Sequence, residues 1–231
     1  MPARYAIYYA PDPDEPLAVF AARWLGRDPE RNCDVARPEY EQLPRQRLAA
    51  VTAEPRRYGF HGTLKAPFIL AADTASDALL AFAADFARQR APFTIPRLRL
   101  AILGDFVALV PAEAALALDR LAAACVQDFD RFRAPPDAAE QARRRQTGLS
   151  PRQQALLARW GYPYVMEEFR FHLTLTGSLA EPELSSVHRV LDALTAPFCA
   201  APVHVRDLAV FVQEDRATAF RILARFPFAA A

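Results

Sequence analysis

Two short segments of the 231-residue sequence carry the same pair of side chains at the same spacing. They are His61-Gly62-Thr63 and His172-Leu173-Thr174, and each lies in a run of residues that favour strands. Residues i and i+2 of a strand point to the same face, so each run presents a histidine beside a threonine. Imidazoles can give or take a proton near neutral pH, and hydroxyls can bind phosphate oxygens. The pattern predicts acid–base cleavage of a phosphodiester.

Two such strands that face one cavity would supply both groups this reaction needs. One histidine takes the proton of an attacking water or hydroxyl, and the other gives a proton to the departing oxygen. Thr63 and Thr174 would bind the non-bridging oxygens. His61 and His172 are therefore the candidate catalytic residues, and either can serve as the base. The prediction is an enzyme that needs neither a metal ion nor a cofactor.

Strand alternation adds three further candidates for substrate binding. Lys65, the only lysine in the chain, shares the predicted face of the first motif. Arg170 and Thr176 lie on the predicted face of the second motif. Arg170 has an alternative role, a surface ion pair with Glu167 or Glu168.

Other residues near the motifs keep two interpretations. Tyr58, Tyr162 and Tyr164 flank the motif strands, where aromatic rings either pack in the core or stack on a sugar or base. The run at 143–145, three consecutive arginines, is typical of a solvated helix face but could hold a second phosphate of the substrate. The two remaining histidines have no hydroxyl residue two positions later and are interpreted as structural or surface groups.

The elements that must position these residues are predicted from hydrophobic periodicity and turn residues. Strands are expected at 4–9, 60–70, 93–103, 105–110, 169–176, 203–213 and 218–226, and helices at 15–25, 45–53, 73–89, 112–132, 150–160 and 181–194. An Ala-Pro-Phe triplet follows a helix in each half, at 91–93 and 196–198, and is expected to lead into a pair of strands.

This order predicts an α+β fold, a single bilobal domain over residues 1–231. Two similar lobes, approximately 1–110 and 111–231, would each form a mostly antiparallel sheet with flanking helices. The lobes would face each other across a central cleft and could exchange strands.

The composition excludes several other classes of protein. With 52% hydrophobic and 24% charged residues, the chain is not disordered. The balance of 28 basic against 27 acidic side chains speaks against binding of duplex nucleic acid. Three widely spaced cysteines predict reduced thiols in a cytoplasmic protein. No basic leader and no apolar run of about 18 residues is present, so neither export nor membrane insertion is expected.

The paired motifs and their surroundings resemble the two-histidine (2H) phosphoesterase superfamily, which includes cyclic nucleotide phosphodiesterases and RNA-ligase-like (LigT-like) enzymes. The resemblance covers nearly the whole chain and is closer to the branch associated with bacterial phosphonate-metabolism operons, the DUF1045-like proteins. It is carried by segments such as RYAIYYA at 4–10, RYGFHGTLKAPF at 57–68 and WGYPYVMEEFRFHLTLTG at 160–177. Gly62 is a mild departure, because alanine is expected there.

The resemblance implies that His61 and His172 form the acid–base pair and that Thr63 and Thr174 bind the phosphate. It implies a metal-independent hydrolase that acts on a small cyclic phosphate or phosphodiester in phosphonate catabolism, for which a ribose 1,2-cyclic phosphate is a suitable substrate. The expected partner is a small phosphorylated metabolite, with no membrane and no duplex nucleic acid, and the oligomeric state stays open.

Two alternatives remain at this stage. One keeps the chemistry and changes the substrate to a nucleoside 2′,3′-cyclic phosphate or an RNA end, although the modest net charge of +1 speaks against long RNA. The other is a non-catalytic protein that binds a phosphorylated metabolite or assists phosphonate metabolism. Two histidines favour catalysis, because a phosphate binder gains more from arginines and backbone N–H groups than from neutral imidazoles.

Overall fold

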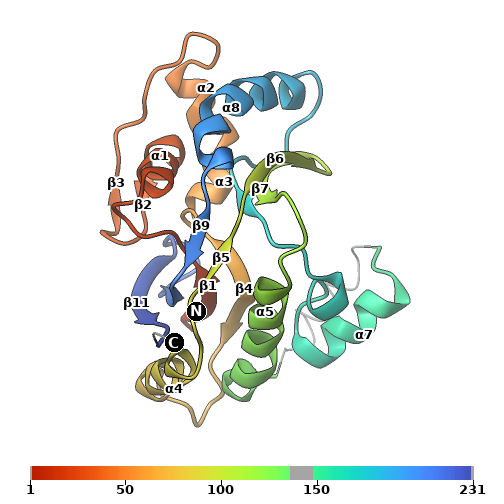
Figure 1. Cartoon of the computed structure of the whole chain (residues 1–231). Helices are drawn as coiled ribbons and strands as arrows, with labels where there is room; N and C mark the ends of the chain where they lie inside the picture. Colours follow the sequence, from red (N-terminus) through yellow and green to blue (C-terminus); the bar gives the residue numbers. More distant parts are fainter. Residues whose placement is uncertain (1, 136–147, 230–231) are drawn as a thin grey trace.

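A seven-stranded antiparallel sheet runs through the molecule in the order β11-β10-β1-β4-β8-β7-β6 (Figure 1). The structure is a computed structural model that describes residues 2–135 and 148–229. The strands of this sheet are β1 (Arg4–Tyr9), β4 (Gly62–Ile69), β6 (Leu98–Leu103), β7 (Phe106–Pro111), β8 (Leu173–Thr174), β10 (Asp207–Gln213) and β11 (Arg221–Pro227). Helices pack around the sheet, so the predicted α+β class is confirmed.

The helices lie in two groups in the view of Figure 1. There, α1, α2 and α8 lie in the upper part of the view and α4, α5 and α7 in the lower part. Their bounds are α1 (Pro16–Leu25), α2 (Arg45–Val51), α3 (Ala53–Arg56), α4 (Ser76–Arg88), α5 (Leu116–Asp128), α7 (Pro151–Trp160) and α8 (Glu183–Ala200), with short 3-10 turns η1 (Phe129–Phe132) and η2 (Met166–Glu168). Among the described residues, no helix combines the length and apolar character needed to cross a membrane.

Two small strand pairs lie outside the large sheet. They join β2 (Arg27–Asp28) to β3 (Cys33–Asp34) and β5 (Phe93–Ile95) to β9 (Val203–Val205). The second pair connects distant parts of the chain, because β5 follows α4 and β9 follows α8. The segment predicted as one strand over 93–103 is therefore divided between two sheets.

The large sheet has a junction at its centre. The four strands β11-β10-β1-β4 meet the three strands β8-β7-β6 through the pairing of Gly62 with Leu173. Both halves of the sequence contribute to each side, since β10 and β11 lie beside β1, and β6 and β7 lie beside β8. The lobe boundary expected near residue 110 stays a prediction.

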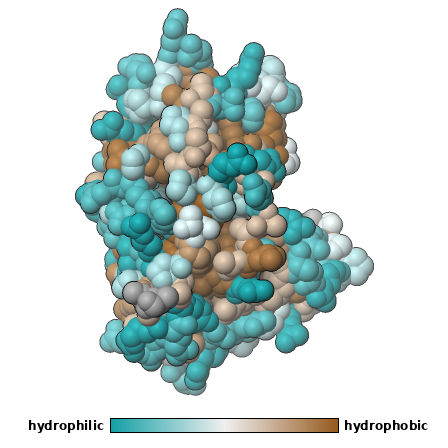
Figure 2. All heavy atoms as spheres, viewed as in Figure 1, coloured by the Kyte–Doolittle hydropathy of each residue, from teal (hydrophilic) through white to brown (hydrophobic). Residues whose placement is uncertain are grey.

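The two faces of β1 bury side chains in different cores. Ile7 and Tyr9 belong to the main hydrophobic core, whereas Ala6 and Tyr8 belong to a smaller cluster with Phe211 and other residues of β10 and β11. This division follows from the alternation of side chains along a strand. On the surface, hydrophilic residues cover most of the rim of the view in Figure 2, and hydrophobic residues gather near its middle.

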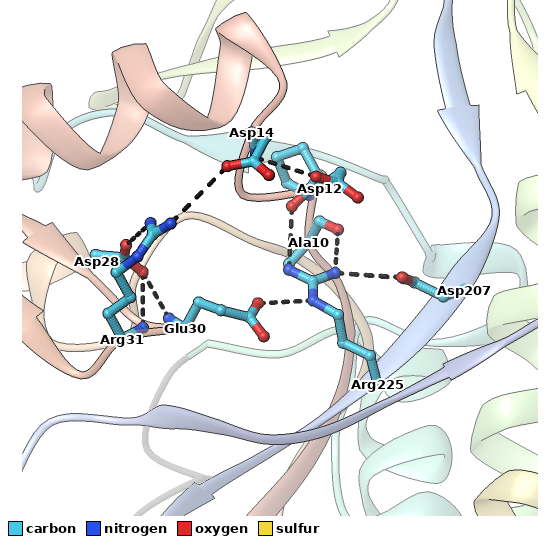
Figure 3. Close-up of polar contacts among 9 residues, drawn as sticks. Ala10, Asp12, Asp14, Asp28, Glu30, Arg31, Asp207 and Arg225 are labelled. Carbon is cyan, nitrogen blue, oxygen red and sulfur yellow. Dashed lines mark hydrogen bonds and ion pairs between the residues drawn. The ribbon is translucent and has the colours of Figure 1, made fainter.

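A half-buried arginine ties the strand ends together on one side of the sheet (Figure 3). Arg225 of β11 donates to the main-chain oxygens of Ala10 at 2.9 Å and Pro11 at 3.1 Å. The same guanidinium pairs with Glu30 at 2.7 Å and with Asp207 of β10 at 3.4 Å. The cluster fixes the end of β1 against β10, β11 and the loop that follows β2.

Two expectations for the second half of the chain are wrong. The helix predicted for 181–194 continues to Ala200 and contains Pro197, so the Ala-Pro-Phe triplet at 196–198 lies inside α8, and the two strands that follow begin only at Val203. The strand expected over 169–176 is shortened to Leu173–Thr174. The residues before it form η2 and an extended loop rather than a ladder with β4.

Candidate active site

A cavity of about 690 Å³ lies at the junction of the two parts of the sheet. Five of the predicted site residues line it, namely His61, Thr63, His172, Thr174 and Thr176. Lys65 and Arg170 are not among the lining residues. The structure therefore brings both His-x-Thr motifs to one cavity.

The register of β4 and β8 brings the two motifs together. Gly62 and Leu173 are paired, and each is the middle residue of its motif. In an antiparallel pair, this register sets His61 opposite Thr174 and Thr63 opposite His172. Because the four flanking side chains share one face, the two motifs are related by an approximate twofold axis.

Gly62 is required by a close approach at this junction. A Cβ atom at Gly62 would lie 2.2 Å from Cε2 of the Phe171 ring. Phe171 is buried in the main core, directly before the second histidine. The glycine that departs from the expected alanine thus makes room for the ring of the other motif strand.

Both imidazole rings are oriented in the same way. Nδ1 of His61 lies 2.8 Å from the carbonyl oxygen of Gly59, and Nδ1 of His172 lies 2.7 Å from that of Arg170. A carbonyl oxygen only accepts, so Nδ1 must carry the proton in each ring. In the neutral form, each Nε2 is then the free base. The Thr63 hydroxyl lies 3.3 Å from Nε2 of His61.

Aromatic side chains enclose His61. Its ring stacks on Tyr8 with 3.9 Å between centroids and 20° between planes, and the Tyr58 ring lies 6.0 Å away. Burial lowers the pKa of His61 to about 4, and the charge of His172 acts in the same direction, against the opposing effect of the Gly59 carbonyl. His61 is therefore neutral at pH 7 and able to accept a proton.

Hydrogen bonds to neighbouring elements hold the second motif in place. The amide of Leu175 donates to the carbonyl of Val107 at 2.9 Å, and the Trp24 indole of α1 donates to the carbonyl of Leu175 at 2.8 Å. The Val107 amide donates to the hydroxyl of buried Thr176 at 2.9 Å. That hydroxyl can still donate to a ligand in the cavity.

The placement predicted for Lys65 is wrong because β4 contains a bulge. Tyr8 of β1 pairs with Thr63, but the preceding residue, Ile7, pairs with Lys65, so Leu64 is an extra residue. A bulge interrupts the alternation of faces, and sequence periodicity does not reveal it. Lys65 consequently does not share the face of the first motif.

The ammonium group of Lys65 is occupied by structural contacts. Lys65 is 3% exposed and donates to the main-chain oxygen of Val126 at 2.9 Å and to Asp130 at 3.1 Å. Asp130 also pairs with Arg133 at 2.7 Å. Lys65 thus fixes the C-terminal end of α5 against β4.

Arg170 is exposed and also lies away from the cavity. Its guanidinium donates to the main-chain oxygens of Glu167 at 3.1 Å and Phe169 at 2.7 Å. These contacts hold the side chain on the surface, so the structure does not bring Arg170 together with the motif residues, and a role in substrate binding stays a prediction. The three arginines at 143–145 lie outside the described residues.

Several cavity residues were missed in the sequence, and two of them lie on β1. Arg4 and Tyr8 of β1 both line the cavity, as do Tyr58, Tyr162 and Tyr164, whose role the sequence left open. Arg4 and Tyr8 are four residues apart and share a face of β1 by alternation. That signal becomes useful only once β1 is known to pair with β4. In the described ranges, no group of three or more His, Cys, Asp or Glu residues is placed to hold a metal ion.

The fold and the cavity define an α+β protein with two His-x-Thr motifs on adjacent antiparallel strands. A family model described as "Protein of unknown function (DUF1045)" matches residues 63–221. This match covers more than half of the chain, and the chain therefore belongs to the DUF1045 family, as the sequence resemblance predicted.

Curated relatives are similar to nearly all of the chain. "Ribose 1,5-bisphosphate phosphokinase PhnN" of Janthinobacterium sp. (strain Marseille) is 38% identical over 229 residues, which cover 97% of this chain and 51% of that protein. The protein of the same name from Laribacter hongkongensis (strain HLHK9) is 38% identical over 221 residues, with 95% and 50% covered. The chain thus spans about half the length of these relatives.

Solved structures with the same overall coverage are more distant in sequence. The structure described as E. coli LigT complexed with 3'-AMP is 18% identical, with a TM-score of 0.45 and 99% of both chains covered. A second structure, described as a phosphoesterase, is 15% identical, with a TM-score of 0.40 and 99% of both chains covered.

Proposed function

We propose that this protein is a phosphoesterase that opens a small cyclic phosphate without a metal ion, with His61 and His172 as the acid–base pair. The observation that supports this most directly is the shared ring orientation, in which both Nδ1 atoms contact a main-chain carbonyl two residues earlier in the chain. Both Nε2 atoms are then free to exchange protons with a ligand in one cavity.

The lowered pKa of His61 supports one assignment of the two roles. Neutral His61 accepts a proton from water through Nε2 while the water oxygen bonds to phosphorus. The bond from phosphorus to one ester oxygen of the cyclic phosphate breaks, and Nε2–H of His172 gives its proton to that leaving oxygen. Thr63 and Thr174 donate to the non-bridging oxygens as their charge increases. The cyclic diester and water become one monoester, and exchange with solvent restores both histidines.

The name of the curated relatives suggests the substrate. A ribose 1,5-bisphosphate phosphokinase requires ribose 1,5-bisphosphate. Hydrolysis of 5-phosphoribosyl 1,2-cyclic phosphate at the bond between phosphorus and O2 leaves that bisphosphate. A chain that matches half of such a relative would therefore supply the compound that the relative's name specifies. We infer that this cyclic phosphate is the substrate, and that the reaction belongs to phosphonate catabolism.

A nucleoside 2′,3′-cyclic phosphate or RNA end is the second candidate substrate. Tyr58, Tyr162 and Tyr164 line the cavity, and Tyr164 is 47% exposed, so its ring could stack on a nucleobase. The chemistry at the histidines would be unchanged.

Phosphorus NMR in the presence of EDTA tests the proposed function. The wild type is expected to convert 5-phosphoribosyl 1,2-cyclic phosphate to ribose 1,5-bisphosphate, and the His61→Ala/His172→Ala variant is not. His204→Ala is the matched control, because His204 contacts Thr94 at 3.2 Å and does not line the cavity. Cleavage of 2′,3′-cyclic AMP alone would favour the second substrate. Binding without cleavage of either compound would favour a non-catalytic binding protein and contradict the proposal.

A further inference from the structure

The cavity lining includes one arginine, Arg4, and two acidic residues, Glu54 and Asp105, and neither carboxylate pairs with Arg4. Arg4 at the start of β1 lines the cavity, and its Nε donates to the side-chain oxygen of Gln213 at 2.8 Å. The guanidinium carbon lies 5.1 Å from the centroid of the Phe220 ring. Both contacts are with uncharged groups. Within residues 2–135 and 148–229, Arg4 forms no ion pair with a carboxylate.

The charge of a second arginine, Arg216, acts on Arg4, although Arg216 does not line the cavity. Arg57 donates to the main-chain oxygen of Arg216 at 2.7 Å, and burial together with the charge of Arg216 lowers the pKa of Arg4. Glu214, close to Arg216 in sequence, pairs with Arg221 at 2.6 Å. Neither Arg57 nor Arg216 has a carboxylate partner in the part of the chain that the structure describes. A bound anion would relieve the repulsion among these guanidinium groups.

Aromatic side chains lie between Arg4 and His61. The Tyr58 side chain forms a hydrogen bond with Arg4, and its ring lies 6.0 Å from the ring of His61. Along β1, Arg4 precedes Tyr8 by four residues, about 13 Å of strand, and Tyr8 stacks on His61. A ligand with one phosphate at the histidines and a second anionic group beyond a sugar would reach both ends.

We propose that Arg4 forms a second phosphate subsite, so that the cavity selects a ribose derivative with a terminal phosphate in addition to the cyclic one. This inference rests on the proposed function for the position of the cyclic phosphate. Nε and one N–H of Nη2 donate to Gln213, which leaves Nη1 and the second N–H of Nη2 of Arg4 as a parallel pair of donors for phosphate oxygens, an arrangement that a lysine cannot offer. A 2′,3′-cyclic nucleotide without a terminal phosphate would leave the subsite unfilled.

Calorimetric binding of two ligands measures the subsite directly. The probes are ribose 1,5-bisphosphate and ribose 1-phosphate, which differ only in the terminal phosphate. The wild type should prefer the bisphosphate by about tenfold or more. Arg4→Gln should lose most of this preference and retain its affinity for ribose 1-phosphate, and Arg4→Lys should be intermediate. Arg97→Gln is the matched control, since Arg97 pairs with Glu113 at 3.2 Å and does not line the cavity.

The ratio of the two dissociation constants decides the outcome. An equal ratio in the wild type and Arg4→Gln would overturn the subsite. If Arg4→Gln does not fold, Arg4→Lys must lower the preference instead, and an unchanged ratio there would overturn the subsite. An Arg4-dependent ratio without cleavage of any cyclic phosphate keeps the subsite and refutes the proposed function. Cleavage of a cyclic phosphate together with a ratio that does not depend on Arg4 would support the proposed function and overturn the subsite.

Discussion

Gly62 and Leu173 face each other across the antiparallel pairing of β4 and β8, and each is the middle residue of a His-x-Thr motif. This one pair joins the two parts of the seven-stranded sheet. It also explains why both motifs open into the same cavity, because antiparallel register sets the histidine of each motif beside the threonine of the other. The candidate active site is therefore a consequence of strand register.

The close approach at this junction makes Gly62 sensitive to the smallest substitution. Gly62→Ala should lower the free energy of unfolding by about 1–3 kcal/mol, because the new methyl group meets the Phe171 ring at 2.2 Å. Adding Phe171→Leu should recover part of the loss, so the double variant is more stable than the sum of the single changes predicts. Urea unfolding of all four proteins checks this. A Gly62→Ala variant as stable as the wild type would show that the junction adapts freely.

The stack of Tyr8 on His61 predicts different effects of two substitutions. Tyr8→Phe keeps the ring that lies 3.9 Å from the imidazole and should retain most of the activity. Tyr8→Leu removes the ring and should lower kcat about tenfold or more, because the imidazole loses its fixed orientation. Steady-state kinetics with a cyclic phosphate, alongside thermal unfolding, separates this effect from loss of fold. Equal activities of the two variants would argue against a positioning role.

Lys65 is expected to matter for stability and not for turnover. Lys65→Met removes the donor to Val126 and one partner of Asp130, while Asp130 keeps its pairing with Arg133. The free energy of unfolding should fall by about 1–3 kcal/mol, and kcat and KM should stay within about twofold, a small effect on the scale of catalytic contacts. Chemical denaturation and kinetics on one preparation test both parts. A large loss of activity in a stable variant would return Lys65 to the site.

The pKa of His61 gives a pH dependence with a definite sign. A general base works when it is unprotonated, so kcat/KM should fall on the acidic side near pH 4 rather than near pH 6.5. In the unfolded chain this histidine binds a proton at about pH 6.5. The contribution of neutral His61 to the free energy of unfolding is therefore fully present above that pH and declines as the pH falls toward 4. His61→Asn should flatten this decline. An NMR titration of the His61 ring with a midpoint near 6.5 would contradict the assignment.

Much of the fold could be predicted from local sequence signals. The first strand, the helix ending before Gly26 and the helix capped by Ser150 have boundaries set by adjacent residues, and the structure contains all three. The Ser150 side chain accepts from the amide of Gln153, as a capping serine should. Features that depend on neighbouring strands could not be predicted. The bulge at Leu64 exists only in the register with β1, and it is the reason that Lys65 leaves the predicted face.

The sequence predicted the two motifs of the candidate site but not all the residues that line its cavity. The two motifs could be found because their spacing matches strand alternation, which is a local property. Arg4 was missed because its place in the cavity depends on the pairing of β1 with β4. Pro197 shows a further limit, since local rules end the helix before it and the packing of α8 carries the helix past it.

The most direct test of the central claim is kcat/KM for His61→Ala, His172→Ala and the double variant, with 5-phosphoribosyl 1,2-cyclic phosphate as substrate. If the two imidazoles act on one phosphate, each single variant should lose about 100- to 10,000-fold. The double variant should then be little worse than either single variant, because the pair acts as a unit. A variant that keeps more than about a tenth of wild-type activity, well above the loss expected on removing an acid or base, would contradict the account.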